Sequence, residues 1–214
     1  MQPLVEKYRP RRVRDFAGLP RAKAIMEKLI ANPFPTAFCL YGSAGTGKTT
    51  LAMAVAEELG AQLHHIPSGQ CTKETVERVT ESCQYMPMFG NSKWHVVLVD
   101  EIDTASHGAQ QVWLSKLDAT GAMDNVIYFF TCNSTAKLEG RFLSRCKEIP
   151  FDGAIDEKEF SVMLYEVWWA EAPAFAQTPH MAKILAESGH NVRRALNEIE
   201  MELMMVPALA KRAA

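Results

Sequence analysis

The chain has 214 residues, of which 48% are hydrophobic and 22% are charged, and its formal net charge is −2. This composition is ordinary for one medium-sized domain with a small appendage, and it excludes disordered and collagen-like classes. No apolar run approaches the roughly 18 residues of a membrane span, and the first residues lack a signal-peptide core, so we expect a cytoplasmic protein without a membrane partner.

The first segment of the chain is basic. Residues 6–28 hold eight Lys and Arg against three acidic residues, a local balance of +5, so the remainder carries about −7. Such a segment suits an anion-facing surface as well as an ordinary solvated one, and charge alone does not decide whether the chain binds DNA. A helical pattern occupies residues 21–31.

An apolar run at residues 37–41 predicts the first strand, and a phosphate-binding motif follows it directly. Residues 42–49 match G-x-x-x-x-G-K-[ST] completely. Chance would place the four fixed positions somewhere in a chain of this length about once in a hundred sequences. The residues predicted to bind the nucleotide here are Gly42, Ser43, Ala44, Gly45, Thr46, Gly47, Lys48, Thr49 and Thr50.

The chemistry of this motif is the binding of a triphosphate by backbone amides. Its glycines allow a positive φ, and the helix predicted at residues 48–59 directs its positive dipole end toward the phosphates. Lys48 is expected to reach the β- and γ-phosphates, and Thr49 to coordinate Mg²⁺. The motif therefore predicts a nucleoside triphosphate bound with Mg²⁺.

The second strand is predicted at residues 62–66 and contains two adjacent histidines, His64 and His65. Consecutive side chains of a strand point to opposite faces, so the pair has poor geometry for a shared metal ion and no metal site is predicted from it. The five cysteines show no C-x-x-C spacing and are odd in number, which indicates buried, reduced thiols. A helix is predicted at residues 72–85.

The third strand, residues 94–99, ends in two acids at the sheet edge where doubly wound folds bind ligands. Asp100 and Glu101 have the form of a Walker B motif. Because a buried apolar strand needs no acids at its tip, Asp100 is expected to hold Mg²⁺ through water, and Glu101 to polarise the attacking water. Asn133, after a fourth strand at residues 126–131, is a candidate to orient that water, although Asn also commonly forms turns.

A helix at residues 105–117, a short one near 136–143 and a fifth strand at 147–151 complete the alternation, which predicts a parallel sheet with helices on both faces. Beyond this strand the pattern is helical only. The later helices are predicted at residues 156–171, 179–187 and 192–205. The predicted division is a nucleotide-binding core at 1–152, a helical domain at 153–206 and a short tail at 207–214.

Seven motifs resemble those of the small subunits of replication factor C, which are AAA+ clamp-loader ATPases, and of related phage clamp-loader ATPases. They occur in the family's order across nearly all of residues 4–200. The motifs are Val5-Glu-Lys-Tyr-Arg-Pro10, Gly42 to Thr49, Asp100-Glu-Ile-Asp103, Gly108-Ala-Gln-Gln111, Thr131-Cys-Asn133, Ser144-Arg-Cys146 and Val192-Arg-Arg-Ala-Leu-Asn197. The resemblance implies an α/β AAA+ fold with a five-stranded parallel sheet in the order 5-1-4-3-2, a small helical lid, and ATP and Mg²⁺ as cofactors.

The resemblance also implies which residues surround the adenine of ATP. These are Tyr8, Arg9 and Pro10, together with the turn Phe16-Ala-Gly18.

Further roles follow from the resemblance for polar residues around the phosphates. Asn133 is the implied sensor 1 residue, and Arg145 the implied arginine finger, which reaches the site of a neighbouring subunit. Arg193 of the lid is the implied sensor 2 residue, which touches the γ-phosphate in its own subunit. From the residues alone, both arginines are equally compatible with surface charges, and Arg194 competes with Arg193 for the sensor role.

The sequence departs from the family in two places. Replication factor C small subunits continue as a helical collar that holds their ring together, whereas this chain ends at Ala214, as a truncated chain or a minimal module would. After the second strand the family usually has Asn-Ala-Ser, and this chain has Ile66-Pro67-Ser68, so we expect no polar residue that couples DNA contact to Glu101. Lys73 and Arg78, on the next helix, either contact the DNA backbone or form a solvated face.

The leading hypothesis is an ATP hydrolase that acts within a homo- or hetero-oligomer of AAA+ subunits and places a sliding clamp on primer–template DNA during replication. A second hypothesis is an AAA+ switch or remodelling ATPase that acts on a protein partner without a clamp. A P-loop kinase for a small molecule is a third, and the implied arginine finger and lid disfavour it.

Overall fold

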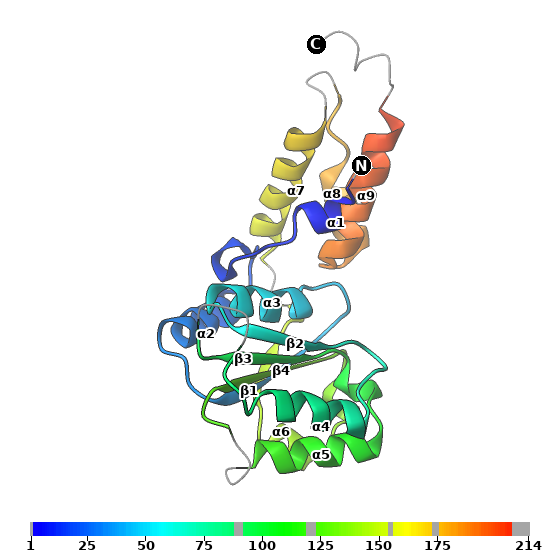
Figure 1. The fold of residues 1–214 in the computed structure, drawn as a ribbon. Helices are drawn as coiled ribbons and strands as arrows, with labels where there is room; N and C mark the ends of the chain where they lie inside the picture. Colours follow the sequence, from blue (N-terminus) through cyan, green and yellow to red (C-terminus); the bar gives the residue numbers. More distant parts are fainter. Residues whose placement is uncertain (1, 88–91, 119–122, 154–155, 173–175, 207–214) are drawn as a thin grey trace.

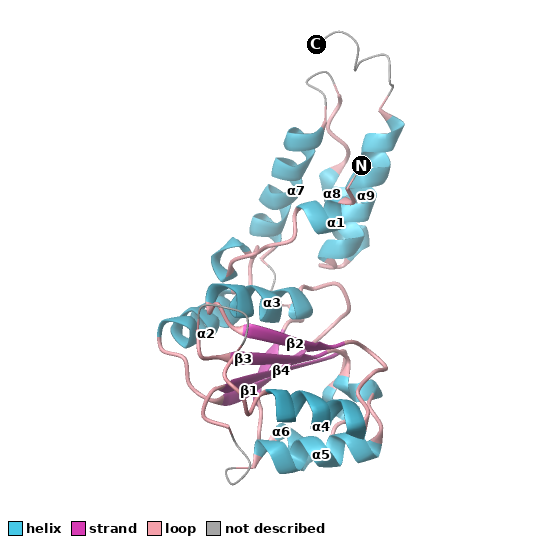
Figure 2. Ribbon diagram, in the orientation of Figure 1, coloured by secondary structure: helices cyan, strands magenta, loops and turns pink. Residues whose placement is uncertain are grey.

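The computed structural model describes residues 2–87, 92–118, 123–153, 156–172 and 176–206, and the predicted tail at 207–214 lies outside them. A five-stranded sheet stands between two groups of helices, and three further helices extend from one end of this core (Figures 1 and 2). Within the described residues, no helix is long and apolar enough to cross a membrane.

The strands form one parallel sheet in the spatial order β2-β3-β4-β1-β5. They are β1 (Thr36–Tyr41), β2 (Gln62–Ile66), β3 (His95–Val99), β4 (Val126–Cys132) and β5 (Lys147–Pro150). The predicted order, named from the opposite edge, is confirmed. The central strands β3 and β4 are buried along their whole length, which explains their continuous apolar sequences.

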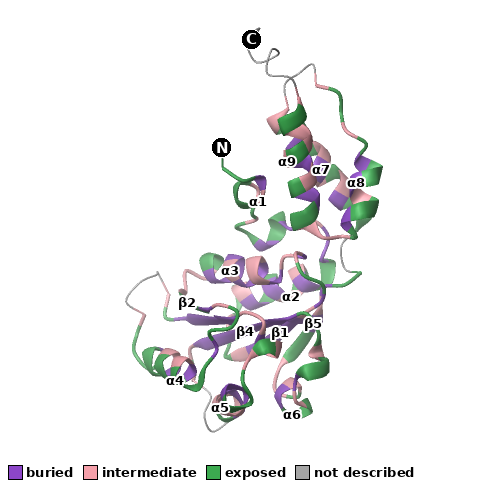
Figure 3. Ribbon diagram, turned by 90° about the vertical axis from the view of Figure 1, so that its right-hand side faces the viewer, coloured by how far each residue is buried: buried purple, intermediate pink, exposed green. Residues whose placement is uncertain are grey.

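Helices cover both faces of the sheet (Figure 3). On one face lie α2 (Pro20–Ala31) and α3 (Lys48–Glu58), and on the other lie α4 (Lys73–Ser82), α5 (His107–Leu117) and α6 (Gly140–Leu143). The core is therefore divided into two layers by the sheet. In the first layer the rings of Phe38 and Phe129 stack, and in the second Trp113 of α5 meets Tyr128 and Phe130 edge-on.

Three further helices follow the sheet and are called the helical domain below: α7 (Glu157–Glu171), α8 (Met181–Ser188) and α9 (Val192–Met205). The N-terminal helix α1 (Leu4–Lys7) lies against this domain rather than against the sheet (Figure 1). Leu4 is fully buried there, and its N–H donates to Glu200 Oε2 at 3.4 Å. The beginning of the chain is thus attached to its last helix.

Side-chain caps determine where several helices begin. Ser106, Asp156 and Asn191 each accept a hydrogen bond from a backbone N–H in the first turn of α5, α7 and α9, respectively. Three short 3-10 turns complete the structure: η1 (Val13–Asp15), η2 (Ile102–Thr104) and η3 (Thr135–Lys137).

Candidate functional site

The loop between β1 and α3 depends on three glycines with positive φ: Gly42 (139°), Gly45 (76°) and Gly47 (97°). Two of them also have no room for a side chain. A Cβ on Gly42 would lie 3.0 Å from Asp152, and one on Gly45 would lie 2.1 Å from Asn191 Oδ1. The loop therefore requires glycine both for its backbone and for the residues that pack against it.

Lys48 is the first residue of α3, and only 7% of it is exposed. Its Nζ donates to the carbonyl oxygens of Gly42 at 2.5 Å and Ser43 at 2.7 Å. Burial lowers the pKa of this amine, and nearby acidic groups oppose the shift. A buried ammonium beside the free amides of a helix start is a site that an anion such as phosphate stabilises.

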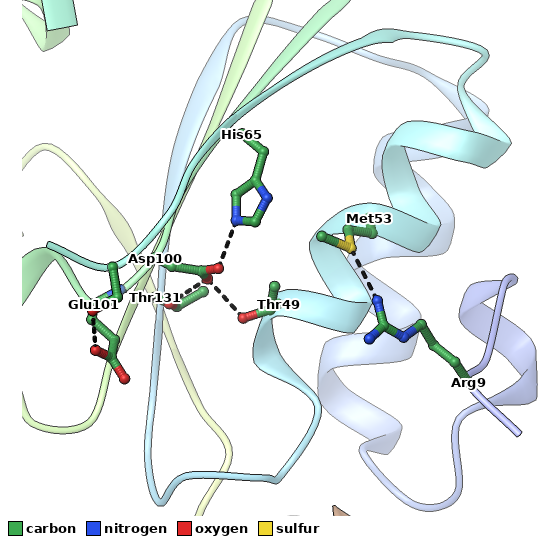
Figure 4. Close-up of polar contacts among 8 residues, drawn as sticks. Arg9, Thr49, Met53, His65, Asp100, Glu101 and Thr131 are labelled. Atoms are coloured by element: carbon green, nitrogen blue, oxygen red, sulfur yellow. Dashed lines mark hydrogen bonds and ion pairs between the residues drawn. The ribbon is translucent and has the colours of Figure 1, made fainter. Parts of the chain in front are cut away.

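Asp100 follows β3 and lies at the centre of a polar cluster (Figure 4). Its Oδ1 accepts from Thr49 Oγ1 at 2.7 Å and from Thr131 Oγ1 at 3.0 Å, and its Oδ2 lies 2.7 Å from His65 Nε2. The two predicted magnesium ligands, Thr49 and Asp100, are therefore in direct contact. Hydroxyl and carboxylate oxygens are ligands that suit Mg²⁺, so these residues fit the ion.

Glu101 has a left-handed backbone with φ of 51°, an uncommon conformation for a residue with a side chain. Its N–H donates to Thr131 Oγ1 at 3.1 Å, and its carboxylate accepts a hydrogen bond from Ser68 Oγ. A polar residue after the second strand thus does reach Glu101, although the usual Asn-Ala-Ser run is missing, and whether DNA contact is coupled to Glu101 stays a prediction. Ser68, two residues beyond the end of β2, restrains the carboxylate.

Asn133 lies directly after β4, beside the phosphate loop. The carbonyl of the preceding residue, Cys132, accepts a hydrogen bond from the Gly42 N–H at 3.3 Å. The predicted sensor 1 residue therefore adjoins the first glycine of the loop.

Arg145 comes shortly after α6, on the side of the core away from the phosphate loop. Its Nε donates to Asp118 Oδ1 at 2.6 Å, and a second nitrogen of the guanidinium donates to the carbonyl of Arg141 at 2.6 Å. Among the described residues, it makes no contact with the phosphate loop of its own chain.

A cavity of about 660 Å³ is lined by residues of both the phosphate loop and the helical domain, and its size is typical of small-molecule sites. Residues of its lining include Tyr8, Arg9, Pro10, Gly45, Thr46, Gly47, Thr50 and Arg193. The cavity thus brings together the residues expected around adenine and one of the two sensor 2 candidates, Arg193. Gly18 lies outside this lining, and its N–H donates to Glu159 Oε2 at 2.6 Å.

Four residues of the site were not predicted: His65, Ser68, Asp152 and Asn191. Asp152 accepts a hydrogen bond from the Ser43 N–H at 2.7 Å, which lowers the pKa of its carboxyl group. None of the four belongs to a local motif. The one available signal was the implied strand order, because it places the carboxyl end of β2, with His65 and Ser68, beside that of β3.

Tyr8 connects the cavity to α7. Its hydroxyl donates to Glu171 Oε1 at 2.5 Å, and Lys7 Nζ lies 2.5 Å from the same oxygen. Burial and the bond to this carboxylate raise the pKa of Tyr8 to about 12, while Lys7 and Tyr8 lower the pKa of Glu171.

We expect Tyr8→Phe to reduce the loss of stability at alkaline pH. A phenol whose pKa is raised from 10 to about 12 stabilises the folded state below pH 10, and this contribution is lost as the pH rises through 12. Urea unfolding between about pH 9 and pH 11 should therefore show a shallower decline in the free energy of unfolding for Tyr8→Phe than for wild type. Glu171→Gln should give an intermediate decline, and equal slopes for all three proteins would contradict the assignment.

Comparisons with known proteins place the chain in a family. The model of the family described as "ATPase family associated with various cellular activities (AAA)" matches residues 38–152. Replication factor C subunit 2 of Arabidopsis thaliana is 27% identical over 214 residues, covering 93% of this chain and 61% of that protein. The replication factor C small subunit of Halobacterium salinarum is 24% identical over 201 residues, covering 92% and 61%. The chain thus spans about three fifths of the length of these relatives.

Two further proteins are similar over part of their length. ATPase WRNIP1 of Dictyostelium discoideum is 31% identical over 148 residues, covering 68% of this chain and 16% of that protein. The solved structure of the Thermotoga maritima RuvB Holliday junction branch migration motor has a TM-score of 0.71 at 18% identity, covering 90% of this chain and 64% of that chain. At this identity the structural likeness shows the fold alone.

Proposed function

The chain belongs to the AAA family of ATPases, and from this premise we propose that it binds ATP between its phosphate loop and its helical domain and hydrolyses it beside Asp100 and Glu101. The observation that carries the proposal is the contact of Thr49 with Asp100 at 2.7 Å, with Glu101 next in the chain. One residue pair thereby joins the phosphate-binding helix to the strand that bears the acids.

Each group of the site has a distinct part in the proposed reaction. The loop amides and Lys48 hold the phosphates, and Thr49 and Asp100 provide the oxygens for Mg²⁺. Bound Mg²⁺ would neutralise charge on the phosphate oxygens. Glu101 accepts the proton of the attacking water, and its hydrogen bonds from Thr131 and Ser68 determine where its backbone and carboxylate lie.

We propose that the site is completed by a second subunit. Arg145 is held by Asp118, away from the phosphate loop of its own chain, so we place the phosphate that it would contact in a neighbouring molecule. In an oligomer of AAA+ subunits, this guanidinium would stabilise the negative charge on the phosphoryl group in the neighbouring site.

The biological role that we propose is that of a clamp-loader subunit in DNA replication. Its support is the similarity to replication factor C subunits over more than nine tenths of the chain. The hydrogen bond from Ser68 to Glu101 adds to this support. This bond connects the proposed catalytic acid to the segment that precedes α4. Helix α4 itself carries the predicted DNA contacts Lys73 and Arg78.

A second candidate role is an AAA+ remodelling ATPase that acts on a protein partner without a clamp. The similarity to ATPase WRNIP1, 31% identical over 148 residues, favours it, because that protein is not named as a clamp loader.

The two roles predict different responses of the ATPase rate. A clamp-loader subunit, with its partner subunits, should hydrolyse ATP several-fold faster when primed DNA and sliding clamp are added together. A double variant Lys73→Ala, Arg78→Ala should weaken DNA binding and reduce its salt dependence, whereas Lys28→Ala, on the other face of the sheet, should not. A rate indifferent to DNA and clamp would favour the remodelling role.

A further inference from the structure

Three residues with metal-binding side chains meet on the α4 face of the sheet. His64 lies on β2, His95 is the first residue of β3, and Cys83 caps the end of α4. One possible ligand atom of each lies within 4.8 Å of the other two, and His64 Nε2 is 2.9 Å from His95 Nδ1.

The sheet register explains why this cluster exists. Gln62 of β2 is paired with His95, and His64 is paired with Val97, so His64 and His95 lie on the same face of the sheet. His65 points the other way and contacts Asp100. The residues that meet His64 in this cluster therefore come from β3 and from the end of α4, and not from its neighbour His65.

His95 is already oriented as a metal ligand. Its Nε2 lies 2.9 Å from the carbonyl oxygen of Tyr85, which can only accept, so Nε2 carries the proton and Nδ1 presents its lone pair to the cluster. Metal-binding histidines are usually held by such a bond from the second ring nitrogen. In this structure, His64 Nε2 occupies the position from which an ion would contact that lone pair.

The surroundings of the cluster are dry but contain one unused polar atom. Cys83 and His95 are each 1% exposed. Tyr128, on the same face, is close enough to Cys83 that the thiol adds to burial in raising the pKa of the phenol. The Tyr128 hydroxyl is buried and has no hydrogen-bond partner in the described part of the chain, so it can accept from or donate to a water bound as a fourth ligand.

We propose that His64, Cys83 and His95 form a structural site for a zinc-class transition metal ion. Two imidazoles and a thiolate are a donor set that selects zinc over magnesium or calcium. Tetrahedral zinc, with bonds of about 2.0–2.3 Å, places its ligand atoms roughly 3.3–3.6 Å apart. The histidine nitrogens therefore need to separate by a few tenths of an ångström, and the Cys83 sulfur, within 4.8 Å of both, needs to approach them. Binding would release to solvent the proton between the two imidazoles and the proton of the thiol.

The ion would fasten the edge strand β2 to β3 and to the end of α4. This matters for the ATPase site because β2 contains His65 and leads into Ser68, which contact Asp100 and Glu101, respectively. A hollow of about 600 Å³ is lined in part by Gln62, which pairs with His95 in the sheet, and by Tyr85, whose carbonyl contacts His95.

Cobalt(II) is a direct probe of this site, because a cysteine ligand gives a thiolate-to-cobalt charge-transfer band that the oxygen ligands of a magnesium site cannot produce. We expect the reduced protein to bind one equivalent of cobalt with this band, and zinc to displace it. Cys83→Ala should abolish the band, and His64→Gln should weaken cobalt binding at least tenfold. Cys71→Ala, which removes another buried thiol near α4, should retain the band.

Thermal unfolding supplies a second measurement. One equivalent of zinc should raise the Tm of wild type and of Cys71→Ala, but not that of Cys83→Ala. Absence of the thiolate band in the wild-type protein, or its persistence in Cys83→Ala, would overturn the proposal. If a variant does not fold, the presence or absence of the thiolate-to-cobalt band in the wild-type protein tests the proposal by itself.

Discussion

Glu101→Gln should stop ATP turnover while leaving ATP bound. We expect kcat to fall by about 10²–10⁴-fold, which is the usual contribution of a general base, with little change in the Kd for ATP. Glutamine matches glutamate in shape and can still accept the hydrogen bond from Ser68. The variant therefore removes the basic group while the side chain at position 101 keeps its place. Phosphate release at saturating ATP and equilibrium nucleotide binding measure the two quantities separately.

Two further variants test whether the loss of turnover is specific to the carboxylate of Glu101. Ser68→Ala keeps the base but releases its carboxylate, so we expect a smaller loss of kcat, within about tenfold. Glu81→Gln, a change to an exposed acid on α4, should leave kcat unchanged. Turnover at the wild-type rate in Glu101→Gln would remove this residue from the proposed mechanism.

Arg145→Ala should reduce ATP hydrolysis by about 10³-fold or more, the range measured for arginine fingers in GTPases. The loss should not arise from unfolding, because the ion pair of Arg145 with Asp118 is partly exposed and such pairs contribute little to stability. Arg141→Ala, a neighbouring arginine whose backbone carbonyl remains in place, is the matched control and should retain activity.

Mixing two inactive variants tests whether Arg145 acts between subunits. Lys48→Ala lacks a functional phosphate loop but carries the finger, whereas Arg145→Ala has the loop but lacks the finger. Mixed together, they should regain part of the wild-type rate, and the specific activity of wild type should rise with protein concentration. An inactive mixture, together with a concentration-independent wild-type rate, would contradict the shared site.

The parts of the fold that were predictable are those in which burial leaves a local pattern. Strands β3 and β4 are covered on both faces, so their sequences are continuous apolar runs, and their bounds were predicted within one residue. The helix α1 could not be predicted in this way. Four residues are too few for a periodic pattern, and Leu4 is buried only because α9, far along the chain, lies next to it.

The same distinction applies to the site. The residues of the phosphate loop and the pair Asp100 and Glu101 were predicted because their chemistry is contained in short motifs. His65, Ser68 and Asn191 were not, since each reaches the site from an element distant in sequence. His64 and His95 are likewise 31 residues apart, and only the pairing of β2 with β3 brings them together.

The attachment of α1 to the helical domain has a mechanical consequence. Leu4 and Tyr8 are fastened to α9 and α7, whereas the Val13 N–H is bonded to Glu58 of α3 at 2.6 Å. The helical domain is therefore joined to the core twice along the chain, by residues 9–12 and by the segment that leads from β5 to α7. Direct contacts add to these two connections, because the Gly18 N–H donates to Glu159 of α7 and the Arg193 N–H donates to the carbonyl of Gly45. A ligand in the cavity beside Tyr8 and Arg193 would touch the phosphate loop and the helical domain at once, so its binding is expected to depend on how these two parts are held together.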